Sequence, residues 1–202
     1  MVANQPDGPS DGSEQRYRHL IENLPICIFV ADLTVIPAVI LKVNRHAELV
    51  YGYTAAELVG NPAAQIVPEE SRASVQDLLE RVQQGETATA ETSNRRRDGT
   101  PFPVRVIATL DPANRGHMIA TVEDITAEKQ RRSEAEARAL IEEMRAKYPR
   151  LLGRQWAEIH RVDLPQGSTY RVMVGPLATS QQATQLCDGL KAQGAECFLR
   201  GT

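Results

Sequence analysis

Three features of the sequence predict an antiparallel α+β fold in two structured parts. Two strand-like runs are followed by several short helical segments and then by three more strand-like runs. The turn Arg97-Asp98-Gly99-Thr100 joins two of the later runs and is typical of a β-hairpin, which favours an antiparallel sheet over a βαβ fold. Residues 127–148 contain neither Gly nor Pro and carry apolar residues at helical spacing. We expect this helix to connect one domain to the next.

The composition argues against several classes of protein. The chain has 202 residues, enough for one or two domains, with only 4% aromatic residues and a net charge of −3, so we expect no binding to nucleic acid. The short basic run Arg95-Arg96-Arg97 is expected to be a solvated loop. No apolar run is long enough to span a membrane, and the N-terminus does not resemble a signal peptide. We therefore expect a cytoplasmic protein, and a periplasmic one only if export follows a route that the sequence does not show.

Local signals place the elements of the first part. Asn44 is expected to cap a short helix, and Thr54 with Glu57 has the spacing of a capping box. Residues 1–12 are expected to be a disordered leader. The expected helices are residues 13–23, 45–50, a short piece after Thr54, and 68–84, and the expected strands are residues 26–31, 38–43, 87–95, 102–110 and 117–123.

Four pieces of residues 17–126 resemble a PAS domain. They are Lys42-Val43-Asn44-Arg45-His46-Ala47, Tyr51-Gly52-Tyr53-Thr54-Ala55-Ala56-Glu57-Leu58-Val59-Gly60, Arg96-Arg97-Asp98-Gly99-Thr100-Pro101-Phe102-Pro103-Val104-Arg105-Val106 and Glu123-Asp124-Ile125-Thr126. The resemblance implies a five-stranded antiparallel sheet with helices on one face and a pocket for a small ligand or cofactor. It also implies that Asp124, Ile125 and Thr126 form the junction that passes a signal to the following helix. The PAS domain is expected to span residues 13–126.

Departures from the family pattern bear on the cofactor, whose identity stays open. Haem-binding relatives carry a His on the long helix, and residues 69–84 contain none. Light-sensing flavin relatives carry a Cys after a Gly-Asn pair, where this chain has Pro62. We therefore expect neither haem nor a cysteinyl-flavin adduct. Cys27 is expected to be a buried structural thiol, and His46 and His117 are not expected to bind metal.

The second part resembles a SPOR domain, over about residues 132–201. Its strands are expected at 157–164, 169–174 and 196–199, with a helix from Thr179 or Ser180 to about 193. The resemblance rests on Tyr170-Arg171-Val172-Met173-Val174-Gly175-Pro176-Leu177, on the helix and strand after it, and on Lys147-Tyr148-Pro149 before it. It implies a small ferredoxin-like α+β unit that binds peptidoglycan, with Tyr170 and Arg171 as candidates for glycan contact. Ordinary strand and surface roles for these two residues are the alternative.

The family's first strand should lie just before Arg132, where residues 126–131 are polar and favour a helix. We expect that strand to be missing, which makes the ferredoxin-like unit incomplete. Residues 127–148 are then a connecting helix and residues 149–202 the SPOR-like domain. Cys187 and Cys197 are close enough in the expected fold to pair, but a cytoplasmic chain favours reduced thiols.

Three functions follow from these patterns. The favoured one is a sensing or interaction module in which the PAS domain binds a small molecule or forms a homodimer with the adjacent helices. The second is a peptidoglycan-binding envelope protein. The third is a sensor fragment of a histidine kinase or other signalling enzyme, but residues 128–148 contain no His and no Gly-rich nucleotide loop follows. We expect no enzymatic activity. The chain could also be a fusion, natural or constructed, of two unrelated halves.

Overall fold

The computed structural model describes residues 11–153, 156–164, 167–175 and 177–199. The chain divides into two compact units, Met1–Thr126 and Ala127–Thr202, and each is described here by itself. Most of the expected leader, residues 1–10, lies outside the described residues.

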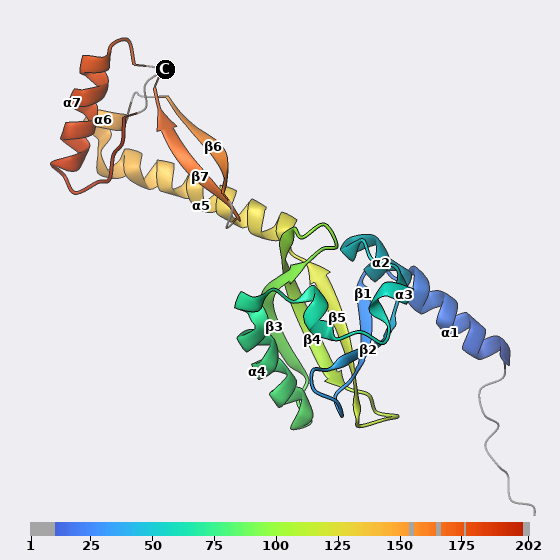
Figure 1. Cartoon of the computed structure of the whole chain (residues 1–202). Helices are drawn as coiled ribbons and strands as arrows, with labels where there is room; N and C mark the ends of the chain where they lie inside the picture. Colours follow the sequence, from blue (N-terminus) through green and yellow to red (C-terminus); the bar gives the residue numbers. More distant parts are fainter. Residues whose placement is uncertain (1–10, 154–155, 165–166, 176, 200–202) are drawn as a thin grey trace, which may run out of the picture. The chain divides into compact units, whose positions relative to one another are not determined.

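The first unit is built on a five-stranded sheet in which every neighbouring pair is antiparallel, as the sequence predicts. The strand order is β2-β1-β5-β4-β3, so the first and last strands in the sequence lie at the centre (Figure 1). The strands are β1 Cys27–Asp32, β2 Val39–Val43, β3 Ala88–Arg95, β4 Pro101–Leu110 and β5 His117–Asp124.

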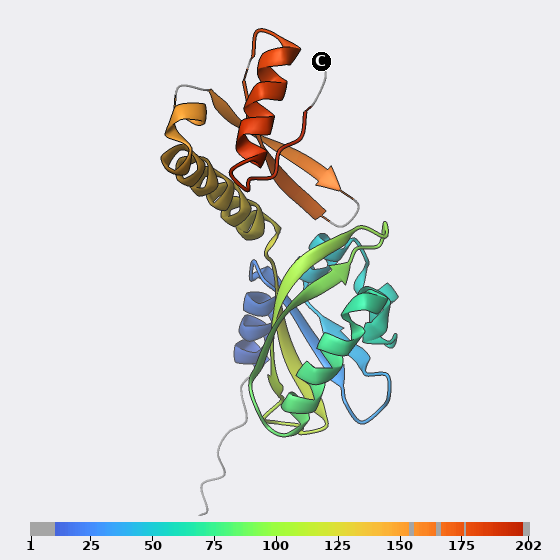
Figure 2. The same ribbon diagram turned by 90° about the vertical axis from the view of Figure 1, so that its left-hand side faces the viewer.

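The helices α2, α3 and α4 cover one face of this sheet, which Figure 2 shows from the side. The long helix expected at 68–84 is divided, because residues 69–71 form a 3-10 turn before α4 begins. The helical segments are α1 Asp11–Asn23, α2 Arg45–Tyr51, α3 Ala55–Leu58, η1 Ala63–Ile66, η2 Glu69–Ser71 and α4 Arg72–Gln83.

Both predicted caps are confirmed. The Asn44 side chain accepts from the Ala47 N–H at 3.2 Å and also from the Ile28 N–H at 3.0 Å, so one buried amide starts α2 and fixes it to β1. The Glu57 carboxylate accepts from the Thr54 N–H at 2.9 Å, which closes the capping box of α3. These bonds satisfy N–H groups that a helix start otherwise leaves without partners.

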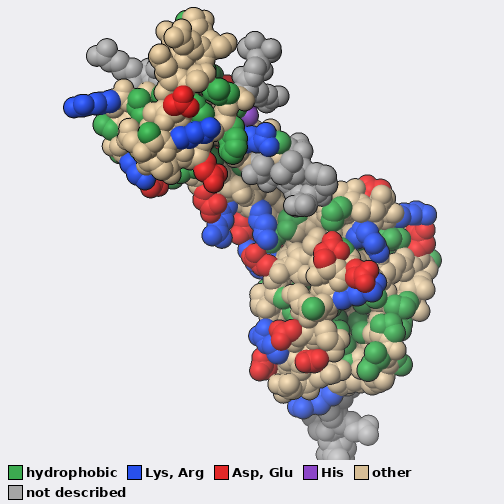
Figure 3. Space-filling model, turned by 60° about the vertical axis from the view of Figure 1, so that its left-hand side comes forward, with side chains coloured by type: hydrophobic (Ala, Val, Ile, Leu, Met, Phe, Trp, Pro, Cys, Tyr) green, Lys and Arg blue, Asp and Glu red, His purple; other side chains and the backbone are tan. Residues whose placement is uncertain are grey.

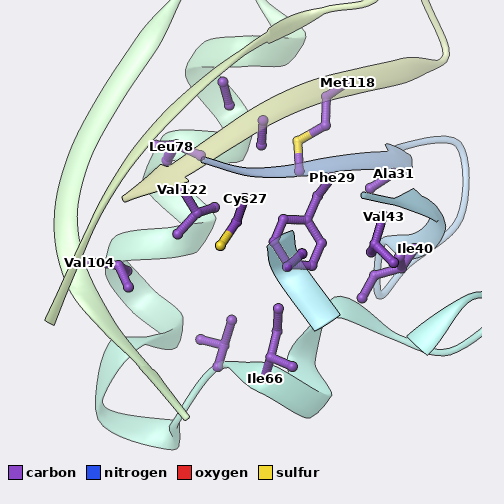
Figure 4. Close-up of a cluster of buried hydrophobic side chains, with 14 of the residues drawn as sticks. Cys27, Phe29, Ala31, Ile40, Val43, Ile66, Leu78, Val104, Met118 and Val122 are labelled. Carbon is purple, nitrogen blue, oxygen red and sulfur yellow. The ribbon is translucent and has the colours of Figure 1, made fainter. Parts of the chain in front are cut away.

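The core of the first unit lies between the sheet and the covering helices. Side chains of β1 and β5, among them Cys27, Phe29 and Val122, point toward Leu78 of α4 and Ile66 of η1 (Figure 4). The apolar stripe of α1 is different, because Tyr17, Leu20, Ile21 and Leu24 stay exposed, Tyr17 at 63%.

The second unit contains a two-stranded antiparallel sheet and a small apolar cluster. The cluster centres on the buried side chains of Tyr148, Leu152 and Leu190, against which Met144 and Val174 pack. Its elements are α5 Thr126–Lys147, α6 Pro149–Leu152, β6 Ala157–Leu164, β7 Gly167–Val174 and α7 Ser180–Lys191.

The continuous helix expected over residues 127–148 is observed as α5. Residues 126–131 are helical, so within the described residues the expected first strand of this sheet is indeed missing. The first half of α5, residues 126–136, buries no side chain and carries charges of both signs (Figure 3). Exposed ion pairs such as Arg132–Glu136 at 2.9 Å and Arg138–Glu134 at 2.6 Å run along its surface. Residues 137 and 141 begin the buried stripe.

The prediction of a closing strand at residues 196–199 is wrong, because these residues lie in irregular structure. A physical reason is the missing first strand. In a ferredoxin-like sheet that strand is central and pairs with the closing strand, so here the usual partner of residues 196–199 is absent.

The expectation of reduced thiols in the second unit is also overturned. Cys187 of α7 and Cys197 form a disulfide, with their Cα atoms 5.5 Å apart. The bond attaches the irregular segment 195–199 to α7, and Ala195 N–H donates to Leu190 O at 3.0 Å beside it. The C-terminal segment is therefore fixed to a helix instead of a sheet.

Candidate functional site

An apolar cavity of about 70 Å³ lies between the sheet of the first unit and its covering helices. Its position explains why small residues occur on the inner face of the sheet, since Ala31, Ala90 and Ala120 leave room that larger side chains would fill. The lining comprises Phe29, Ala31, Ile40, Ala63, Ile66, Val67, Val75, Leu78, Leu79, Ala90, Thr92, Asn94, Val106, Met118, Ala120 and Val122.

The polar lining of this cavity is limited to Thr92 and Asn94. One N–H of the Asn94 amide is already used, because Nδ2 donates to the Tyr51 hydroxyl at 2.5 Å. Tyr51 is 0% exposed and Asn94 is 4% exposed. Burial raises the pKa of the Tyr51 hydroxyl, so this hydroxyl remains neutral. A ligand in the cavity would meet an almost wholly apolar wall.

Three aromatic rings lead from the cavity toward the end of the sheet. Phe29, which lines the cavity, contacts Tyr51 edge-on with ring centroids 5.3 Å apart. Tyr51 contacts Phe102 in the same manner, also at 5.3 Å. Edge-to-face pairs of this kind have a defined geometry, so a displacement of one ring requires the next to adjust.

Arg96 continues this row of contacts. Its guanidinium lies 3.9 Å from the centre of the Phe102 ring, and its Nη2 is 2.6 Å from Asp124 Oδ2. Its Nη1 donates to Val50 O, near the C-terminus of α2, where a positive charge is favourable. The expected solvated loop at Arg95-Arg96-Arg97 is thus wrong for Arg96, and also for Arg95, which ends β3 and donates to Gln65 O at 3.3 Å. Arg97, the other neighbour of Arg96, is more exposed and pairs with Glu57 at 2.6 Å.

Asp124 joins Arg96 to the start of α5. One carboxylate oxygen, Oδ2, pairs with Arg96, and the other, Oδ1, accepts from the Thr126 N–H at 2.9 Å. Partial burial opposes ionisation of Asp124, but the hydrogen bond from the Thr126 N–H and the pairing with Arg96 outweigh it and lower the pKa of this carboxyl. Ile125 between them is buried, and its N–H donates to Pro103 O at 3.1 Å. The three junction residues predicted from the sequence therefore meet at one corner.

Cys27 is expected to be unreactive in the folded protein. Its side chain is 2% exposed, and burial, with a smaller contribution from Asp124, raises the pKa of the thiol to about 12. Since the thiolate is the reactive species, a disulfide reagent at pH 8 should modify Cys27 only as the first unit unfolds. Thiol titration with and without denaturant measures this. Rapid modification of the native chain at Cys27 would contradict it.

The other residues predicted for binding lie apart from one another. His46 of α2 lines a hollow beside Asp124, whereas His117 begins β5 and contacts Asn114 at 3.2 Å. Within the described residues no group of three His, Cys, Asp or Glu side chains is placed to hold a metal ion. Tyr170 is half-buried and Arg171 exposed on β7. As neighbours in a strand their side chains point to opposite faces of the sheet, so a glycan contact by either residue stays a prediction.

Four residues of this site were not predicted from the sequence: Tyr51, Asn94, Arg96 and Phe102. The one signal that could have found them is that three of the four lie inside the PAS-like pieces of sequence.

Comparison with known families fits this geometry. Residues 25–127 match the model of a PAS domain, and residues 131–201 match that of a SPOR domain. The chain belongs to the PAS domain family, and a SPOR domain follows its PAS domain. Comparison with curated protein sequences gave no match.

Solved structures share the fold of the first part. The PAS domain of an HTR-like protein from Haloarcula marismortui is 25% identical, with a TM-score of 0.50 over 57% of this chain and 93% of its own. A PAS domain from Colwellia psychrerythraea is 20% identical, with a TM-score of 0.50 over 57% and 98%. An RNA-binding light-oxygen-voltage receptor is 21% identical, with a TM-score of 0.55, and this chain covers 42% of it. The PAS match and the SPOR match together support a sensing or interaction module.

No helix among the described residues combines the length and the apolar character needed to cross a membrane.

Proposed function

We propose that the first unit is a non-catalytic sensor whose cavity binds a small, uncharged, apolar molecule. The observation that carries the proposal is the unbroken row of contacts from the cavity through Phe29, Tyr51, Phe102 and Arg96 to Asp124. A molecule that fills the cavity would press on Phe29, and the last contact in the row holds the first N–H of α5. Asp124, Ile125 and Thr126 would then be the point at which the signal leaves the unit.

The size and the lining of the cavity narrow the ligand class. A cavity of about 150 Å³ lined by apolar side chains holds one benzene molecule, and the cavity here is about 70 Å³. A flavin or a haem is several times larger and needs polar partners that the wall does not offer. A molecule of a few heavy atoms without charge fits both constraints.

Xenon is a suitable probe of this cavity, because apolar cavities of this kind bind it. We expect xenon under pressure to shift the NMR signals of the methyl groups that line the cavity, such as those of Leu78 and Met118. Ala120→Val should weaken the response at least tenfold, since the added methyl groups occupy the cavity. Thr121→Val is the matched control, because the neighbouring side chain lies on the other face of β5. Equal xenon-induced shifts in the two variants would contradict the assignment of this cavity as the binding site.

The same xenon titration, measured at the amide of Thr126, tests whether the row of contacts from the cavity to Asp124 carries the signal. We expect xenon to shift the amide of Thr126 in the wild type and not in Arg96→Gln, which keeps the length of the side chain but loses its charge. A Thr126 shift that persists in Arg96→Gln would show that the signal does not pass through Arg96.

A homodimer is the second part of the proposal. It is supported by the exposed apolar stripe of α1, where Tyr17, Leu20, Ile21 and Leu24 have no covering element among the described residues. Light scattering after size exclusion measures the mass, and Leu20→Glu should lower it toward that of a monomer. If the wild-type chain were monomeric at every concentration, the proposed homodimer would be ruled out.

Peptidoglycan binding by the second unit is a separate candidate, favoured by the SPOR match over residues 131–201. Co-sedimentation with purified peptidoglycan tests it. Retention that is lost in Tyr170→Ala would support a glycan contact on β7, and failure of the wild-type chain to sediment would remove this candidate.

A further inference from the structure

The second unit has a sheet with two open edges. Among the described residues β6 and β7 pair only with each other, and none of their described side chains is buried. A sheet in a packed domain normally buries one face against a core, and an unpaired edge leaves backbone N–H and C=O groups available to another strand.

The hydrogen-bond alternation shows which groups of β7 point outward. Gly175 N–H donates to Trp156 O at 2.9 Å, just beyond the two strands. In the same register Met173 and Arg171 lie opposite Glu158 and His160, two and four residues further along. Hydrogen-bonded pairs recur at every second residue of an antiparallel ladder, so the N–H groups of Arg171 and Met173 are directed toward β6.

The alternate residues of β7, Tyr170, Val172 and Val174, therefore direct their N–H and C=O groups to the open edge. Their side chains share one face of the strand, and Val174 packs on the apolar cluster of the unit, so this face is turned toward the cluster. All three are half-buried. Another strand at this edge would find three donors, three acceptors and a continuous apolar face.

The outer edge of β6 is less suited to pairing. Its outward row contains the exposed, charged Arg161. Charged side chains along an edge oppose the addition of a strand. Within the described part of β7 the one charged residue is Arg171, whose backbone is directed to β6 and not to the open edge.

The segment that would have been the closing strand of this chain does not cover the edge. Cys197 is attached to Cys187 of α7, and Phe198 is left 88% exposed. Residues 195–199 pair with no strand in the described structure.

We infer that the open edge of β7 pairs with β7 of a second copy of this chain, which makes a four-stranded sheet across a two-fold axis. Two identical antiparallel strands related by such an axis allow only a few registers. The register with Val172 opposite itself places Tyr170 opposite Val174 on the apolar face and forms about six main-chain hydrogen bonds. It also places Arg171 opposite Met173. Shifting the pairing by one step would bring the two Arg171 side chains face to face, which is unfavourable.

Residue-resolved amide hydrogen exchange on the full chain tests the inference, and it does not depend on the proposed sensing function. At concentrations where copies associate, the amides of Tyr170, Val172 and Val174 should exchange at least tenfold more slowly than in dilute solution. Arg171 and Met173 are internal controls, because β6 protects them at every concentration. Association through the first unit would leave all five amides unchanged.

Placing a charge at Val172, which lies on the proposed two-fold axis, tests the register of the β7–β7 pairing. Val172→Lys and Val172→Glu should each abolish the added protection of Tyr170 and Val174, because each places like charges opposite each other. Mixing the two variants should restore it, which also shows that both are folded. Gln185→Lys and Gln185→Glu, exposed on α7, are matched controls without effect. Protection that is already present in the dilute monomer, or no restoration on mixing, would overturn the proposal.

Discussion

Replacing Tyr51 with alanine is expected to lower the free energy of unfolding of the first unit by about 3–5 kcal/mol. Tyr51 is fully buried, and its ring contacts those of Phe29 and Phe102. Its loss leaves a large cavity beside the apolar cavity already described, and it removes the hydroxyl that accepts from the buried Asn94 amide. Chemical denaturation, with unfolding monitored by amide exchange in β1 and β5, measures the change in the free energy of unfolding.

Two further variants separate the causes of this loss. Tyr51→Phe keeps the ring and removes only the hydroxyl, so it should cost about 1–3 kcal/mol because Asn94 loses its partner. Leu49→Ala removes an apolar side chain that is 71% exposed on α2 and should cost less than about 0.5 kcal/mol. If Tyr51→Ala cost no more than Leu49→Ala, the aromatic row would not be part of the core.

Loss of the Arg96–Asp124 pair is expected to be the next largest effect. Arg96→Ala should cost about 2 kcal/mol, because it leaves a charged partner and Val50 O without their donor. The two side chains are 29% and 28% exposed, so solvent screens part of their attraction and the upper end of the range for charged hydrogen bonds does not apply.

The pH dependence of this pair has a definite sign. The pKa of Asp124 is lowered in the folded protein, so the unfolded chain binds more protons in acid. Its contribution to stability is present above the ordinary Asp value of about 3.9 and is lost as pH falls through the lower folded value. Asp124→Asn should therefore be less stable than the wild type at pH 7, with the difference shrinking below pH 4.

Urea midpoints at several pH values measure this difference. Asp32, Glu57 and Asp98 also have lowered pKa values, so the wild type loses stability in acid for several reasons, and only the comparison with Asp124→Asn isolates one. Asp77→Asn, exposed on α4, is the control. A difference that stayed constant from pH 7 to pH 3 would mean that the charge on Asp124 does not matter.

Much of the fold could be predicted because its signals are local. The Asn44 cap, the Thr54–Glu57 capping box and the Asp98-Gly99 turn each depend on residues a few positions apart. Gly99 has φ of 89°, which an Asp-Gly turn requires. The hydrogen bond from the Thr126 N–H to Asp124 is local in the same way, since the two residues are two positions apart, whereas a role for this junction in signalling stays a prediction.

The rest of the site depends on contacts between distant parts of the chain. Tyr51 and Asn94 are 43 residues apart, and Arg96 and Asp124 are 28 apart. Nothing in the neighbourhood of Arg96 distinguishes it from Arg95 or Arg97. Only the folded chain brings Phe102 against Arg96 and Gln65 O within reach of Arg95, so periodicity alone could not separate these two arginines from the exposed Arg97.

The failed strand at residues 196–199 has a related cause. The pattern of the segment itself suits a strand, and what decides its structure is whether a neighbouring edge exists. The strand that pairs with this segment in the family is absent, because residues 126–131, about seventy positions earlier, form part of the helix α5.

The unburied first half of α5 has a mechanical consequence. Residues 126–136 are held as a helix by backbone bonds and by exposed ion pairs, without a core beneath them. Such pairs weaken as dissolved ions screen them, over a distance of about 8 Å at physiological ionic strength. The rigidity of this segment is thus set partly by the surrounding electrolyte, and a twist applied at its N-terminus would travel less far in concentrated salt than in dilute buffer.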